Sequence, residues 1–104
     1  MIITQEIILS YLKELKPELE AVGIEKIALF GSFATNSQNV YSDIDIAIKK
    51  KQDFLDEYSA YDYFNIISKI KSKISSKLHK RTDVFDLDSQ SSFKKQIGKE
   101  LIYV

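Results

Sequence analysis

The chain has 104 residues with equal numbers of acidic and basic side chains, so its formal net charge is zero, and 44% of its residues are hydrophobic. This size and balance predict one globular domain spanning residues 1–104, and they argue against a protein that binds nucleic acid through charge alone. The absence of cysteine excludes disulfides and cysteine-ligated zinc.

The N-terminus lacks the basic region and long apolar stretch of a signal peptide. No apolar run approaches the roughly 18 residues that a membrane span needs. We therefore expect a cytoplasmic protein.

The first predicted element is a helix that Thr4 caps. Pro17 interrupts its apolar pattern, which indicates either one helix that bends there or a second short helix that runs to a stop at Gly23. The residues at helical spacing are Ile7, Ile8, Tyr11, Leu12, Leu15 and Leu19.

Two strands are expected next. Residues 24–30 form an apolar run that ends at Gly31-Ser32, and residues 33–42 are polar enough for one helical turn and a loop. Residues 43–48 alternate isoleucines with Asp43, Asp45 and Ala47. Because the intervening segment is too short for a crossover helix, a mixed or antiparallel sheet is expected.

The second half begins with a charged connection at residues 49–53 and a long helix between Leu55 and Leu78. Its apolar stripe comprises Phe64, Ile67, Ile70, Ile74 and Leu78, with Ile66 beside it. A third strand is predicted from Thr82 to Leu87.

The predicted chain ends in a last helix and an apolar tail. Ser89 or Ser91 would cap the helix, Gly98 would end it, and residues 101–104 would pack against the core. The helix would carry Phe93 and Ile97.

Asp43 and Asp45 stand two residues apart on a strand, so their carboxylates point the same way and could share a hard cation such as magnesium or manganese. An EF-hand is excluded because Ile48 and Phe54 occupy the positions that require glycine and glutamate. The alternative is a pair of exposed acids at the start of a strand.

Gly31-Ser32 follows an apolar strand and could hold phosphate oxygens, since glycine permits positive φ and a helical turn presents free N–H groups. On its own this pair is also an ordinary turn. Together with Asp-x-Asp at one fixed spacing, the pattern arises by chance on the order of 10⁻⁵ times per start position, which favours a functional reading.

The segment that carries both features reads GSFATNSQNVYSDIDIAI. It resembles the Gly-Ser…Asp-x-Asp signature of the DNA polymerase β-like nucleotidyltransferases. The short chain is similar to the minimal nucleotidyltransferase (MNT) antitoxins that pair with HEPN-domain toxins. The resemblance implies an α/β (α+β) palm, with a small mixed β-sheet of about three strands flanked by helices.

The resemblance also implies a third carboxylate on a later strand, for which Asp83 and Asp86 are candidates. We prefer Asp83 because it enters the predicted strand early, directly after Lys80-Arg81 and Thr82. Asp83 would share one strand face with Phe85 and Leu87, and Asp86 would lie on the other.

The implied enzyme is a magnesium-dependent nucleotidyltransferase. Asp43, Asp45 and Asp83 would be its catalytic and metal-binding residues in a two-metal site, and Gly31 and Ser32 would bind the nucleotide. By family resemblance the donor is ATP and the acceptor is a tyrosine hydroxyl of a cognate HEPN toxin. The alternative is an antitoxin that neutralises its partner by binding alone. The sequence leaves homo- and hetero-oligomers open.

One departure from the family is Thr35-Asn36, where many members carry Arg-Gly. Asn36 can replace glycine in a left-handed conformation, but Thr35 cannot replace a cation. The cations that could stand in are Lys49, Lys80 and Arg81.

Overall fold

The computed structural model describes residues 2–88 and 100–104. Its helices are α1 (Gln5–Ala21), α2 (Phe54–Glu57) and α3 (Ala60–Leu78). Its strands are β1 (Ile24–Phe30), β2 (Ile44–Lys50), β3 (Thr82–Asp86) and β4 (Ile102–Tyr103). The strands form one sheet in the order β3-β2-β1-β4.

Helix α1 begins as predicted. The Thr4 hydroxyl accepts a hydrogen bond from the N–H of Ile7 at 3.3 Å, and Pro17 lies inside a single helix that continues to Ala21. Of the two alternatives, the structure has one helix rather than two. Gly23 follows its end with a φ of 96°, a conformation that glycine adopts without strain. The buried stripe is Ile8, Leu12, Leu15 and Leu19.

Strands β1 and β2 are antiparallel, and β2 begins one residue later and ends two residues later than predicted. The charged connection was expected to begin at Lys49, but Lys49 pairs with Lys26 and Lys50 pairs with Ile24. A strand can continue through lysines because backbone groups make the pairing and the long side chains still reach water.

The predicted long helix is divided into α2 and α3. Ser59 caps α3 through a reciprocal capping box, in which its hydroxyl accepts from the Asp62 N–H at 3.1 Å and the Asp62 carboxylate accepts from the Ser59 N–H at 2.9 Å. The prediction that Phe64 belongs to the buried stripe was wrong. Phe64 is 65% exposed, and Tyr63 is buried in its place, because the helix turns residue 63 rather than 64 toward the sheet.

Strand β3 pairs with β2 in parallel, so the sheet is mixed, as predicted. The expected apolar tail contributes a fourth strand, since β4 pairs with β1 through Tyr103↔Ala28 and Ile102↔Leu29. The predicted last helix, with Ser89, Ser91, Phe93, Ile97 and Gly98, lies outside the described residues.

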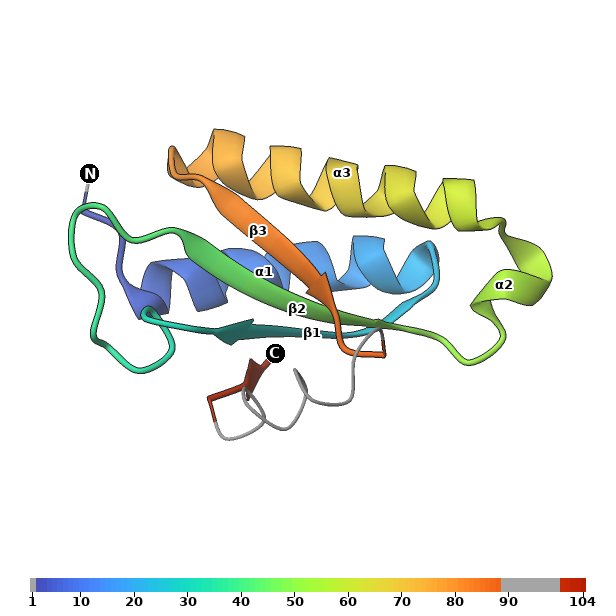
Figure 1. The fold of residues 1–104 in the computed structure, drawn as a ribbon, viewed down its shortest axis with the longest axis horizontal. Coiled ribbons are helices and arrows are strands. Elements are labelled where there is room, and N and C mark those ends of the chain that lie inside the picture. The colour runs from blue at the N-terminus through green and yellow to red at the C-terminus, as the bar shows by residue number, and fades with distance from the viewer. Residues whose placement is uncertain (1, 89–99) are drawn as a thin grey trace.

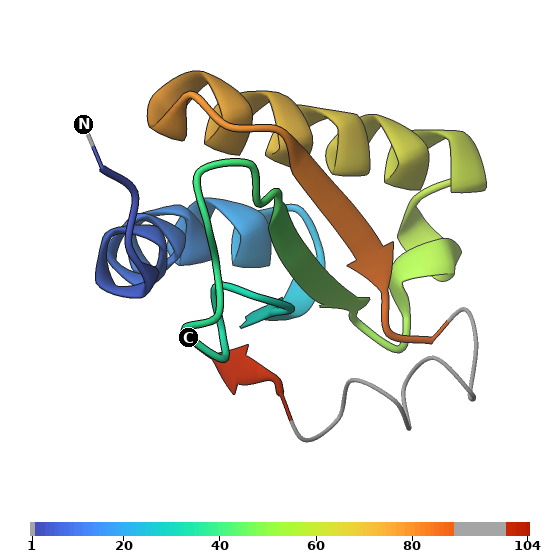
Figure 2. The ribbon, with the colours of Figure 1, turned by 60° about the vertical axis from the view of Figure 1, so that its left-hand side comes forward.

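Helices α1 and α3 cover one face of the sheet (Figure 1; Figure 2). Their buried residues pack on Ile44, Ile46 and Ile48, which are fully buried. On the opposite face, Phe30, Ala47 and Leu87 form a smaller apolar cluster. Within residues 2–88 and 100–104, no helix is long and apolar enough to cross a membrane.

Candidate active site

The sheet topology brings three strand ends together. Strand β1 ends next to Gly31, β2 begins after Asp43, and β3 begins at Thr82. Because β1 runs antiparallel to β2 and β3 runs parallel to it, these three positions lie at one end of the sheet. Residues from three distant segments therefore meet there.

Asp45 and Asp83 occupy matching positions on neighbouring strands. They are register partners in the β2–β3 ladder, and Asp45 is also the partner of Phe30 on β1. Residues in register share a face of the sheet, so both aspartates lie opposite the face that α1 and α3 cover. Asp43 precedes β2, and all three carboxyl groups belong to half-buried residues.

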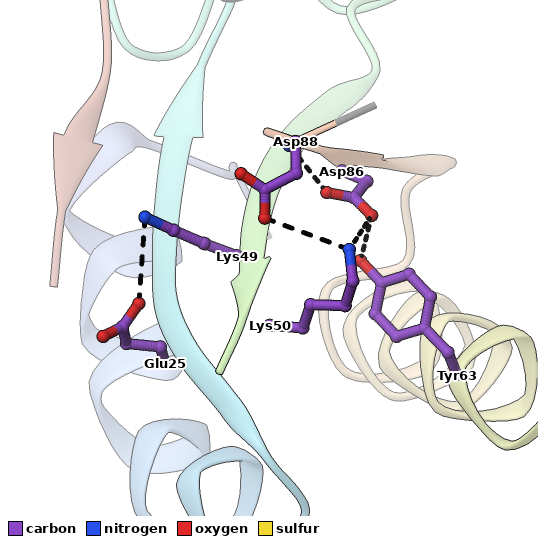
Figure 3. A network of polar contacts seen from close by, with 6 residues as sticks. All are labelled: Glu25, Lys49, Lys50, Tyr63, Asp86 and Asp88. Atoms are coloured by element: carbon purple, nitrogen blue, oxygen red, sulfur yellow. Dashed lines mark hydrogen bonds and ion pairs between the residues drawn. The ribbon is translucent and has the colours of Figure 1, made fainter. Parts of the chain in front are cut away.

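Asp86 is the register partner of Ile48 and therefore lies on the face that the helices cover, and Figure 3 shows it beside Tyr63 of α3. Its carboxylate accepts hydrogen bonds from the Tyr63 hydroxyl at 2.7 Å and from the Lys50 Nζ at 3.1 Å. Burial alone would raise the pKa of Asp86, but the hydrogen bonds from Tyr63, the Asp88 N–H and Lys50 hold it below its ordinary value. The geometry thus brings Asp83, and not Asp86, beside Asp45.

The turn after β1 requires glycine at position 31. Gly31 has a φ of 76°, and a Cβ atom there would lie 2.3 Å from Oδ2 of Asp45. The Gly31 carbonyl accepts hydrogen bonds from the N–H groups of Ala34 and Thr35, and the Ser32 carbonyl accepts from Ser37. The predicted helical turn is therefore present, and the absent side chain lets the turn approach the acids.

Sequence reasoning missed one residue of this region, Glu100. Its Oε2 accepts a hydrogen bond of 3.3 Å from the Gly31 N–H. No local pattern could have indicated this contact, because 69 positions separate the two residues and only the pairing of β4 with β1 joins them.

The carboxylates at this end of the sheet disturb one another. Burial first, and then the nearby charges of Asp83, Asp43 and Glu100, together raise the pKa of Asp45 to about 6. Grouped acids with an elevated pKa are typical of sites that bind cations or transfer protons.

This shift predicts how stability depends on pH. Asp45→Asn is expected to raise the free energy of unfolding at about pH 7 by about 1 to 2 kcal/mol, after allowance for solvent screening. The pKa of Asp45 is about 6 when folded and 3.8 by reference, so the penalty of its charge is fully present above about pH 6 and fades as pH falls toward 4.

Urea unfolding of wild type and variant in metal-free buffer measures this difference. The two curves of stability against pH should approach each other as pH falls and converge below about pH 3, where folded and unfolded Asp45 are both protonated. A difference that stays constant from about pH 4 to 8 would show that the charge of Asp45 is not the cause.

The residues that replace the family Arg-Gly pair form part of the turn. Asn36 has a φ of 57°, so the left-handed conformation expected of it is confirmed. The Thr35 hydroxyl lies within hydrogen-bond distance of the carbonyls of Gly31 and Ser32, each at 3.3 Å. Thr35 thus stabilises the turn and supplies no charge.

The three cations considered as stand-ins lie in different places. Lys49 is four residues beyond Asp45 on β2, roughly 13 Å along the strand, and pairs with Glu25 at 4.0 Å. Lys80 donates to the carbonyls of Val40 and Ser42 at 3.2 and 3.4 Å. Arg81 is exposed directly before β3. Lys49 is therefore too distant, whereas Lys80 and Arg81 lie at the correct end of the sheet.

A cavity of about 390 Å³ adjoins the loop after the turn. It is lined by Phe33, Gln38 and Lys80 together with Ile2 and neighbouring residues, and none of the three aspartates lines it. The acids instead lie on the face of the sheet opposite α1 and α3.

The amino-acid sequence matches a known protein family. The family described as "Polymerase beta, Nucleotidyltransferase" matches residues 11–104. The chain belongs to this family. This nucleotidyltransferase is also 33% identical over 102 residues to a protein of Methanocaldococcus jannaschii named "Putative protein adenylyltransferase MJ0126", with 96% of this chain and 93% of the relative covered.

Solved structures confirm the fold. The structure of a toxin–antitoxin with AMP-PNP aligns with 24% sequence identity and a TM-score of 0.62. The alignment covers 88% of this chain and 69% of the matched chain. The structure of a tri-AMPylated Shewanella oneidensis HEPN toxin in complex with MNT antitoxin aligns with 22% sequence identity and a TM-score of 0.61. The alignment covers 96% of this chain and 71% of the matched chain. The predicted family, enzyme class and α/β fold of this nucleotidyltransferase are therefore confirmed.

Proposed function

We propose that this nucleotidyltransferase transfers AMP from ATP, with magnesium, to a tyrosine hydroxyl of a HEPN-domain toxin, and so acts as an antitoxin. The observation that carries the proposal is the register of Asp45 with Asp83 on one sheet face beside the Gly31 turn. The relative named as a protein adenylyltransferase and the matched toxin–antitoxin folds support the choice of donor and acceptor.

The donor atoms suit magnesium. Carboxylate oxygens are its preferred protein ligands, and it is usually held by one or two carboxylates together with phosphate oxygens of the substrate. Among the described residues, no three acidic, histidine or cysteine side chains are grouped closely enough to hold a metal by themselves. We therefore expect Asp43 and Asp45 to bind magnesium together with the triphosphate rather than before it.

Each residue has a role in the proposed reaction. The Gly31 N–H and the Ser32 hydroxyl bind the β- and γ-phosphates, and Asp43, Asp45 and Asp83 bind magnesium. The acceptor oxygen forms a bond to the α-phosphorus while the bond from that phosphorus to the bridging oxygen breaks, and pyrophosphate leaves. Asp83 takes the hydroxyl proton as the general base of the reaction. Magnesium held by these aspartates would supply electrostatic stabilisation of the negative charge that develops in this displacement.

A second candidate function is neutralisation of the toxin by binding alone. Thr35 favours it, because the turn uses its hydroxyl and the position supplies no cation for the triphosphate. The elevated pKa of Asp45 favours the enzyme, because a group of unneutralised acids reduces stability without serving a binding interface.

The test is a labelling reaction. The protein is mixed with a candidate HEPN-domain partner from the same organism, magnesium and ATP labelled at the α-phosphate, and the products are separated by electrophoresis. Label on the partner is expected, and mass spectrometry should place one AMP on a tyrosine. The Asp43→Asn/Asp45→Asn variant should label at least about 10²-fold more slowly.

Asp53→Asn/Asp56→Asn is the matched control, because it removes the same charge from two exposed residues at α2, and it should label like wild type. Unlabelled partner that nevertheless forms a tight complex with wild type and with both variants would reject the enzyme and support the binding-only candidate.

A further inference from the structure

The Glu100 side chain occupies the turn that the proposed function gives to phosphate. Its Oε2 accepts the Gly31 N–H at 3.3 Å, so a carboxylate oxygen lies where a phosphate oxygen would accept the same hydrogen bond. One N–H group directed at one position cannot serve both acceptors well. Glu100 and a bound triphosphate are therefore in competition.

The position of Glu100 in the chain lets its side chain leave without unfolding the sheet. Glu100 precedes β4, whose residues Ile102 and Tyr103 pair with β1. The tail is further held where the Val104 N–H donates to the Ile27 carbonyl at 3.1 Å. Rotation of the Glu100 side chain breaks none of these contacts.

The same carboxylate also adds negative charge where a triphosphate must approach. Glu100 is one of the charges that disfavour the ionised form of Asp45, so the two carboxylates are close enough to repel. A triphosphate carries the same sign of charge and would be repelled as well.

We infer that Glu100 is a built-in competitor of the nucleotide, which holds the Gly31 amide in the free protein and must release it before a triphosphate binds. This inference rests on the proposed function, because it assigns the Gly31 amide to phosphate. It predicts that the wild-type chain binds nucleotide more weakly than its site allows.

Affinity for a non-hydrolysable ATP analogue with magnesium tests the inference, measured by isothermal titration calorimetry. Glu100→Ala removes both the competing acceptor and the charge, and it should tighten the dissociation constant by about 3- to 10-fold. Glu100→Gln retains an acceptor without charge and should give a smaller gain. Glu20→Ala, an exposed change on α1 near the opposite end of β1, should leave the affinity at the wild-type value.

A second measurement observes the contact without nucleotide. The chain has three glycines, and only Gly31 follows a phenylalanine, so labelling phenylalanine carbonyls with ¹³C and glycine amides with ¹⁵N selects the Gly31 amide alone. Its proton resonance should move upfield in Glu100→Ala as the hydrogen bond is lost. In wild type, the magnesium–analogue complex should displace Glu100 and shift the same resonance at saturation to the position found for saturated Glu100→Ala.

The outcomes separate this inference from the proposed function. Wild type that binds the analogue, with equal or weaker binding by a folded Glu100→Ala, overturns the competition alone. No binding by wild type, Glu100→Ala or Glu20→Ala overturns the proposed function, and the competition with it. Melting curves establish that each variant is folded. If Glu100→Ala does not fold, the affinity of Glu100→Gln decides instead, and affinity equal to or weaker than wild type overturns the competition.

Discussion

Asp83→Ala is expected to slow AMP transfer by about 10²- to 10⁴-fold while leaving the protein as stable as wild type or slightly more stable. Asp83 is the register partner of Asp45, so its loss removes a proposed metal ligand and proton acceptor together with a repulsive charge. Labelling of the partner protein measures the rate, and urea unfolding measures the stability.

Asp86→Ala is the matched comparison and is expected to do the reverse. It removes the acceptor of the Tyr63 hydroxyl and Lys50, which should lower the free energy of unfolding by about 1 to 3 kcal/mol and leave the transfer rate of folded protein within about twofold. If Asp86→Ala abolished transfer and Asp83→Ala did not, the third acid of the site would be Asp86.

Gly31→Ala is expected to damage both stability and nucleotide binding. Alanine at a φ of 76° is strained, and its Cβ would lie 2.3 Å from Oδ2 of Asp45. We expect a loss of about 1 to 3 kcal/mol in the free energy of unfolding. We also expect at least about tenfold weaker binding of the ATP analogue, because Asp45 and the turn must separate.

Gly23→Ala separates strain from site chemistry. Gly23 also has positive φ, and a Cβ there would lie 2.6 Å from the Phe54 ring, but it precedes β1 at the opposite end from the acids. It should be destabilised to a similar degree and bind the analogue like wild type under conditions in which it is folded. Equal loss of binding in both variants would show that the Gly31 effect is a general loss of stability.

Much of the fold could be predicted because its elements follow local patterns. Thr4 caps α1, the run before Gly31 forms β1, and alternating isoleucines form β2, since each feature depends on residues a few positions apart. The prediction placed one helix between Leu55 and Leu78 and missed the break at Ser59, although Ser59 and Asp62 have the spacing of a capping box.

The choice between Phe64 and Tyr63 was not available from the sequence. Both are aromatic and adjacent, and the buried one is decided by how α3 rotates against the sheet. Tyr63 is the better solution in three dimensions because its hydroxyl finds Asp86 at 2.7 Å while its ring packs near Phe54.

The family, the two strands around the Gly31 turn and the candidate acids could be predicted from the sequence alone, because these depend on residue types at fixed short spacing. The position of Asp83 rather than Asp86 beside Asp45, and the contact of Glu100 with the Gly31 amide, became visible in three dimensions. Both follow from strand pairing between segments far apart in the chain, and no local pattern specifies which strands become neighbours or which face each residue takes.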